Sequence, residues 1–424
     1  MKKSLFVLVV TFFLYRAAFG QLTPKINPAD VKNVATLIKM DTNQLVTDYT
    51  FRRTFADEFA KIISTDNFST SATKYATINI DEEKSTFAFS PWVQHWGDQE
   101  KGEPLTSYFN LSIKGEVNSD DIATLFNDKG FNRNLQIGFN YNYLLNKSSR
   151  FHDVSAADMR QFRDDKKSLL SDVETYYTDL LTTPAKPLSF LENKEALTSI
   201  NGLNKAFIKK FSEAEEKLAA PHWTAASFYW MGASGTLGYT TQNALNTTTN
   251  ELTIIQYLSP SFMVSGNMFR NGPNSIVSFY GNIYIKADTK NSFTGKDPVS
   301  WNRIGKIDDS TILIQEKKDV FNYDPKDYSK KFLPTIGAQA ILMIKDKVGL
   351  DISVKHEWLV KSSTEVKAPQ KTNQSYGLVF PFNDKDGERT INIEVFYSHD
   401  TFNLASLSGN DFWGAKFSIP MFSK

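Results

Sequence analysis

Residues 134–145 have the sequence NLQIGFNYNYLL, and apolar and polar side chains alternate through it without interruption. One parity carries Leu135, Ile137, Phe139, Tyr141, Tyr143 and Leu145, and the other carries Gln136, Gly138, Asn140 and Asn142. Successive side chains of a β-strand point to opposite faces of a sheet. Period two over this length therefore predicts a strand with one apolar face and one polar face.

The same alternation recurs from about residue 72 to the end of the chain, for example in LDISVKHEW at 350–358 and TINIEVFY at 390–397. We predict twelve strands, at 72–81, 85–95, 104–116, 133–146, 223–242, 251–269, 275–287, 333–346, 349–361, 374–383, 389–399 and 411–422. The links at 270–274, 345–349 and 383–388 are short and turn-like. The links at 147–221, 288–332 and 362–373 are long.

Two-faced strands of about ten residues, joined by short turns and long loops, are typical of a transmembrane β-barrel. Such a sheet must close, because an open edge in lipid leaves backbone groups without hydrogen bonds. The predicted fold class is all-β, a transmembrane antiparallel β-barrel of about twelve strands with a helical-hairpin insert. The apolar parity would face lipid, with Tyr141 and Tyr143 in an aromatic girdle. A large soluble β-sandwich is the alternative that alternation alone leaves open.

The last residues, DFWGAKFSIPMFSK at 411–424, resemble the terminal strand of Gram-negative outer-membrane β-barrel proteins, the porin-like superfamily. The alternating positions are Trp413, Ala415, Phe417, Ile419 and Met421. Members of that superfamily more often end on an aromatic residue, whereas Ser423 and Lys424 follow Phe422 here. The resemblance implies a location in the cell outer membrane, contact with outer-membrane lipid, and recognition of this strand by the barrel-assembly machinery.

The N-terminal residues 1–20 have the features of a signal peptide, with two lysines, an apolar run and the small residues Ala18 and Gly20. The chain has no cysteine, and export without disulfides suits a Gram-negative cell envelope. A net charge of +1 with interspersed signs predicts no nucleic-acid partner. We divide the remainder into an N-terminal periplasmic extension at 21–70 and the barrel at 71–424.

The 147–221 insert is predicted to be a helical hairpin, because its apolar residues are spaced mainly by threes and fours. A break is expected at TTPAKP, and the second helical tract, opening at Ser189, is expected to be interrupted near NGLN at 201–204. Counting strands back from the C-terminus puts the insert on the periplasmic side. The two helices could pack on each other and on the barrel mouth, or form a gate, a plug or a docking surface for envelope proteins.

The polar parity supplies the side chains expected to line the lumen. These are Asn110, Lys114, Gln136, Asn140, Asn142, Tyr280, Asn282, Asp351, Lys355, Glu357, Asn392 and Glu394, with Asn79 and Lys416 nearby in the pattern. Charges of both signs suit a weakly selective water-filled pore, and they suit equally a lumen closed by inward salt bridges.

Nothing in the motifs predicts a cofactor, a metal or catalysis. The five histidines show no metal-ligand spacing, and no phosphate-binding loop or nucleophile elbow occurs. Ser398, His399 and Asp400 are the types of residue used by lipid-modifying hydrolases. Neighbours on a strand point to opposite faces, however, so Ser398 and His399 cannot pair without a bend.

The function predicted from the sequence is a passive, porin-like channel for small polar solutes, not an enzyme. Two alternatives remain open at this stage. One is a non-conducting structural or scaffold barrel that docks envelope partners through the 147–221 insert. The other is a lipid-modifying outer-membrane enzyme that uses the neighbourhood of Ser398 and His399.

Overall fold

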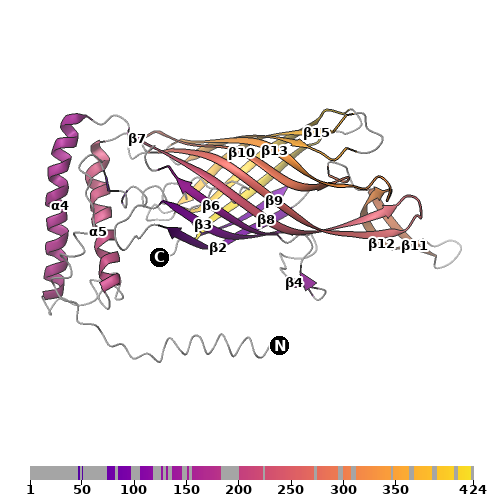
Figure 1. The fold of residues 1–424 in the computed structure, drawn as a ribbon, viewed down its shortest axis with the longest axis horizontal. Coiled ribbons are helices and arrows are strands. Elements are labelled where there is room, and N and C mark those ends of the chain that lie inside the picture. Colours follow the sequence, from indigo (N-terminus) through magenta and orange to yellow (C-terminus); the bar gives the residue numbers. More distant parts are fainter. Residues whose placement is uncertain are drawn as a thin grey trace, which may run out of the picture. The chain divides into compact units, whose positions relative to one another are not determined.

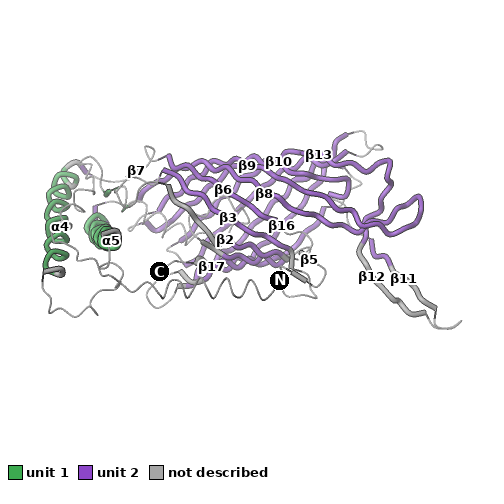
Figure 2. The backbone as a smooth tube through the Cα atoms, turned by 60° about the horizontal axis from the view of Figure 1, so that its bottom comes forward, with its two compact units in different colours: residues 1–50, 98–103, 156–219 green, residues 51–97, 104–155, 220–424 purple. Residues whose placement is uncertain are grey.

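The computed structural model separates into two compact units, a β-barrel and a helical unit (Figure 2). It describes residues 46–47, 50, 74–81, 85–96, 106–117, 126–127, 130–131, 136–145, 150–151, 155–182, 200–222, 225–271, 275–294, 299–306, 312–344, 347–361, 367–383, 389–404 and 409–421. The predicted signal peptide lies outside these residues.

Twelve antiparallel strands form a closed barrel, which confirms the predicted fold class (Figure 1). The barrel strands are β1 (Lys74–Asp81), β2 (Ser85–Trp96), β3 (Ser107–Val117), β6 (Gln136–Leu144), β8 (Ala226–Asn246), β9 (Leu252–Asn271), β10 (Val277–Asn291), β13 (Lys330–Ile344), β14 (Val348–Trp358), β15 (Gln370–Asn383), β16 (Arg389–Phe402) and β17 (Asp411–Met421). The first strand pairs with the last, and β8 pairs with both β6 and β9. Every barrel strand therefore has two neighbours, and no edge is left open.

The outer face of the barrel is apolar, as the alternation in β6 illustrates. Ile137 is 58% exposed and Phe139 is 46% exposed, whereas Asn140 and Asn142, which follow them on the other parity, are fully buried. Large apolar residues of the other barrel strands are exposed in the same way. Such a face is stable in contact with hydrocarbon. With its even strand number and polar interior, the molecule has the architecture of an outer-membrane β-barrel.

The barrel has a short-turn end and a long-loop end, defined by the links between its strands. The short links 272–276, 345–347 and 384–388 lie at the end where β1 starts and β17 finishes. Following the antiparallel pairs around the barrel, β6 ends and β8 begins at this same end. The chain therefore enters and leaves the helical insert at the short-turn end, as the strand count predicts.

The 288–332 link, predicted to be a polar loop, contains a further hairpin of β11 (Val299–Lys306) and β12 (Ile312–Tyr323). The end of β12 pairs with β8 in parallel at Phe321–Tyr323. Phe293 stacks on Phe321 with ring centroids 5.0 Å apart, and Tyr328 lies beside Phe293. Burial raises the pKa of Tyr328. Smaller elements are β4 (Phe126–Asn127), β5 (Gly130–Phe131) and β7 (Arg150–Phe151), which pairs with β8.

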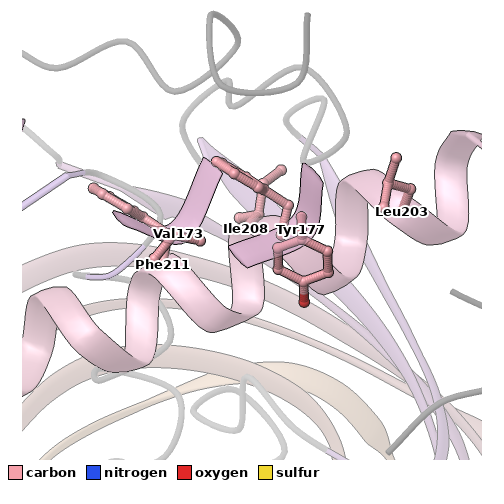
Figure 3. Packing of buried hydrophobic residues seen from close by; sticks show 6 residues of the cluster. Val173, Tyr177, Leu203, Ile208 and Phe211 are labelled. Atoms are coloured by element: carbon pink, nitrogen blue, oxygen red, sulfur yellow. The ribbon is translucent and has the colours of Figure 1, made fainter. Parts of the chain in front are cut away.

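The helical unit contains α4 (Ala156–Thr182) and α5 (Ile200–Ala219). The short 3-10 helix η5 (Ala220–His222) follows α5 in the chain. The two α-helices pack through a buried apolar cluster of Val173, Tyr177, Leu203, Phe207, Ile208 and Phe211 (Figure 3). The interruption predicted at 201–204 is wrong, because α5 is continuous there and Leu203 is fully buried against the cluster. Packing outweighs the low helix propensity of Gly202. The tract 189–199 lies outside the described residues.

None of the helices in the described part of the chain is both long enough and apolar enough to cross a membrane.

Candidate functional site: the barrel lumen

The structure places all the predicted lumen-lining side chains on the inward face of their strands, opposite the exposed apolar parity. They differ in how much solvent reaches them. Asn110, Asn140 and Asn142 are fully buried, whereas Lys355 is 40% exposed at its side chain. Tyr280, Asn282, Asp351, Asn392 and Glu394 are also buried, and Lys114, Gln136 and Glu357 are intermediate. The inward side chains are therefore fully buried at one level of the lumen and partly exposed at another.

Buried inward side chains of eleven barrel strands occupy the half of the lumen next to the short-turn end. We call this set the septum: Ser90, Tyr108, Asn110, Ser112, Asn140, Asn142, Trp230, Asn267, Phe269, Tyr280, Asn282, Ile341, Met343, Asp351, Val379, Asn392, Glu394 and Ser418. None of them is more than 5% exposed. Burial this complete on the concave face of a barrel shows that the lumen is filled at this level, as in small barrels whose interiors are filled.

Four of the eighteen septum residues are aromatic, namely Tyr108, Trp230, Phe269 and Tyr280. Trp230 stacks on Tyr280 with centroids 6.1 Å apart. The ring of Phe228 lies 6.0 Å from that of Phe269 in a tilted arrangement. Trp230 was not among the predicted lumen-lining residues. Phe228, Tyr229 and Trp230 are consecutive aromatic residues, and such a run does not show which of them faces inward. The inward small residues that follow at Gly232 and Ser234 carry the parity signal that would have assigned it.

Amides connect the polar part of the septum, and Asn267 is at its centre. The Tyr280 hydroxyl donates to Asn267 Oδ1 at 3.2 Å, and Asn282 Nδ2 donates to the same oxygen. Asn267 Nδ2 in turn donates to Ser265 Oγ at 3.0 Å. An amide can donate and accept at once, which lets Asn267 link Tyr280, Asn282 and Ser265.

Charged side chains also pair inside the lumen, between residues of the same strand or of nearby strands. Within the septum and just beside it, Lys416 Nζ lies 3.2 Å from Glu394 Oε1. Toward the long-loop end, Glu357 lies 2.5 Å from Lys355 Nζ and 3.2 Å from Lys290 Nζ. At both levels, lysine side chains are thus paired with carboxylates.

The candidate catalytic residues near the long-loop end do not converge. Ser398 is buried on the inward face and accepts a hydrogen bond from Asn373 Nδ2 at 2.7 Å. His399 is on the outward face and pairs with Asp411, and Asp400 is bound by Lys371 inside the lumen. Among the described residues, no group of three or more potential metal-ligating side chains comes together.

A second buried polar cluster holds the helical unit together, and it includes part of the predicted N-terminal extension. Glu215 on α5 is fully buried, and Lys166 on α4 lies 2.8 Å from its Oε1. The backbone N–H of Thr47 donates to Oε1 at 2.9 Å, and the Thr47 hydroxyl donates to Oε2 at 2.6 Å. The Thr50 hydroxyl donates to the same oxygen. Thr47 and Thr50 thus belong to the helical unit.

No protein-family model matches the chain. No curated protein matches it in sequence. Among solved structures it is similar to the transport unit of the autotransporter AIDA-I from Escherichia coli, at 9% identity and a TM-score of 0.30, over 88% of this chain and 98% of that chain.

It is also similar to the beta domain of the Bordetella autotransporter BrkA, at 7% identity and a TM-score of 0.28, over 82% of this chain and 99% of that chain. A third similar structure is an anion-selective porin from Comamonas acidovorans, at 8% identity and a TM-score of 0.25, over 82% of this chain and 99% of that chain. TM-scores this low do not distinguish one barrel family from another, and the barrel architecture rests on the strand pairing and the exposed apolar face.

Proposed function

We propose that this protein is a non-conducting outer-membrane barrel that anchors its helical unit to the membrane, and that the helical unit binds another component of the cell envelope. The observation that carries the first half of this proposal is the septum. Its side chains come from eleven of the barrel strands, and none is more than 5% exposed. A solute could cross that level only if several packed side chains moved together.

The passive channel that the sequence favours remains a prediction, and the septum counts against it. Lys355, which is 40% exposed at its side chain, lies on the long-loop side of the septum. Opening the septum would expose the Trp230–Tyr280 stack and separate the amides bound to Asn267. Both changes cost free energy unless a ligand compensates for them.

The second half of the proposal rests on the construction of the helical unit. Its two helices share a buried apolar cluster, and Glu215 fixes residues 46–50 to them from a distance of 168 residues along the chain. A unit with its own core can keep its shape while its outer faces contact a partner. Short turns of outer-membrane barrels face the periplasm. The attachment of the insert at the short-turn end therefore favours a periplasmic partner.

Thiol labelling tests the septum, since the chain has no cysteine of its own. We expect a charged, water-soluble maleimide to label Lys355→Cys, on the long-loop side of the septum. It should leave Asn142→Cys unlabelled, because Asn142 is fully buried. Thr249→Cys, in an exposed turn, is the positive control. Labelling of Asn142→Cys within about tenfold of the Lys355→Cys rate would mean that the septum admits small solutes. Planar-bilayer recordings of the folded wild type should correspondingly show no conductance steps.

Deleting residues 150–220 and joining the flanks by a short Gly/Ser turn tests the helical unit. The barrel should still assemble, since β6 and β8 pair along Gln136–Leu144 without it, and envelope proteins cross-linked to the wild type should be lost. Folding is checked by the shift between unheated and heated protein on a gel. A variant lacking 299–323, at the opposite end of the barrel, should keep the partners. Unchanged cross-linking after the 150–220 deletion would refute the docking role.

The lipid-modifying enzyme also remains an untested alternative. Because Ser398 and His399 point to opposite faces of β16, we expect a His399→Ala variant to leave the envelope lipids unaltered. Lipid analysis by mass spectrometry of cells carrying the variant measures this directly.

A further inference from the structure

A groove of about 670 Å³ lies on the outward face of the barrel wall, across β8, β9, β10, β13 and β14. Small residues occupy its base: Gly266, Gly281, Ala338 and Ala340. Larger apolar side chains stand on either side of them, including Met231, Met268, Ile283, Ile352 and Val354. The strand register interleaves the two kinds, because Gly266 pairs with Met231 and Ile283, and Ala338 pairs with Ile283 and Val354.

Gly266 is unusual because nothing in the protein requires a glycine there. A Cβ atom at this position would meet its nearest neighbour, Ile283 Cγ1, at 3.6 Å, which is an ordinary contact. The pairing of β9 with β8 and with β10 shows no register shift at this residue. By contrast, a Cβ on the outward-facing Gly235 would lie 2.5 Å from the ring of Phe139. Gly235 makes room for a side chain of the barrel, whereas Gly266 does not.

A glycine inside a strand costs stability and marks a bulge, a bend or the close approach of another molecule. With no bulge at Gly266, the close approach of another molecule to the strand backbone accounts for it. The groove also fits a small molecule in size, since ligand sites usually measure about 300–1,000 Å³. The occupant must make few hydrogen bonds, because the amide residues that line the groove, Asn267, Asn282 and Gln339, have inward parity, and Tyr229 alone among its outward lining residues has a polar side-chain group.

We propose that this groove binds one acyl chain of an outer-membrane lipid and holds it more tightly than the lipid around the rest of the barrel. The groove is continuous with the apolar outer face, so the medium that surrounds it is hydrocarbon. An alkyl chain in the groove contacts protein on several sides, and its dispersion contacts increase in proportion. The inference does not depend on whether the lumen conducts.

Native mass spectrometry of the full-length protein, released from micelles that contain palmitoyl-oleoyl phosphatidylethanolamine, tests the proposal. We expect one lipid to remain on the wild type at collision energies that remove all others. Gly266→Leu fills the groove with a side chain and should lower the retained fraction about tenfold. Ala338→Leu, on another strand of the same groove, should lower the retained fraction in the same way. Agreement between the two variants would show that the effect does not come from misfolding of one of them. Ala287→Leu adds the same bulk at an outward position of β10 outside the groove and should retain the lipid.

Several outcomes would overturn the proposal. One is a wild type that loses every lipid at the same collision energy. Another is equal retention in Gly266→Leu and Ala287→Leu, which would show that the tight lipid sits elsewhere. A third is a wild-type dimer that Gly266→Leu converts to a monomer, because the groove would then hold a second copy of the chain. The gel shift on heating confirms that each variant is folded before it is compared.

Discussion

Replacing Tyr108, Trp230 and Tyr280 together by alanine should turn a silent barrel into a conducting one. The three rings are almost completely buried in the septum, and two of them stack on each other. Removing them leaves space lined by Asn142, Asn267 and other polar groups, which water can fill. Discrete, reproducible conductance steps in planar bilayers should appear in the variant and be absent from the wild type.

The matched control is a variant in which three outward-facing residues, Tyr143, Tyr376 and Trp413, are replaced by alanine. It removes the same residue types, two tyrosines and one tryptophan. These residues are 49%, 47% and 63% exposed. The control should remain silent. Each buried aromatic truncation costs about 3–5 kcal/mol, so recordings count only for protein that still shifts on heating. A folded septum variant that stays silent, or a wild type that conducts, would contradict the closed lumen.

Glu215→Ala should loosen the helical unit and leave the barrel unchanged. The substitution leaves Lys166 buried without its carboxylate and removes the acceptor of the Thr47 and Thr50 hydroxyls. Breaking one side of a buried ion pair typically costs about 3–5 kcal/mol. Hydrogen exchange should therefore rise throughout α4, α5 and residues 46–50. The heat-induced gel shift of the barrel should be the same as in the wild type.

Two further variants separate the ion pair from the hydrogen bonds to the N-terminal segment. Lys166→Met combined with Glu215→Leu replaces the pair by apolar side chains and should restore protection of α4 and α5. Residues 46–50 should stay unprotected, since their acceptor is still missing. Asp164→Ala breaks the exposed pair with Lys167 on the same helix, and we expect no measurable change. If Glu215→Ala leaves exchange unaltered, the cluster does not hold the unit together.

The local alternation of apolar and polar residues was sufficient to predict the barrel. In β6, strict alternation already separates Phe139 and Tyr141 from Asn140 and Asn142, because the two faces of a strand meet lipid and lumen. The same periodicity located the twelve barrel strands to within a few residues. The β11–β12 hairpin was not predicted, because tracts such as IQEKKD at 314–319 have no regular alternation and their pairing depends on the end of β8.

The parity of a side chain follows from the sequence, but its exposure does not. Asn142 and Lys355 are both inward residues of the predicted lumen, yet one is fully buried and the other 40% exposed. That difference depends on which side chains of other strands lie opposite them, and on Trp230, whose parity was ambiguous among consecutive aromatic residues. The sequence alone therefore favoured a pore without excluding a closed lumen.

The sequence by itself determined the elements of this protein and their two faces, because period two and period 3.6 are properties of neighbouring residues. Only the tertiary structure decided what those faces meet. The septum gathers side chains from strands spread over more than 300 residues. The Glu215 cluster joins residues 168 positions apart. The groove around Gly266 exists only where five strands lie side by side. Contacts between distant segments depend on the closure and register of the sheet, which no local pattern specifies.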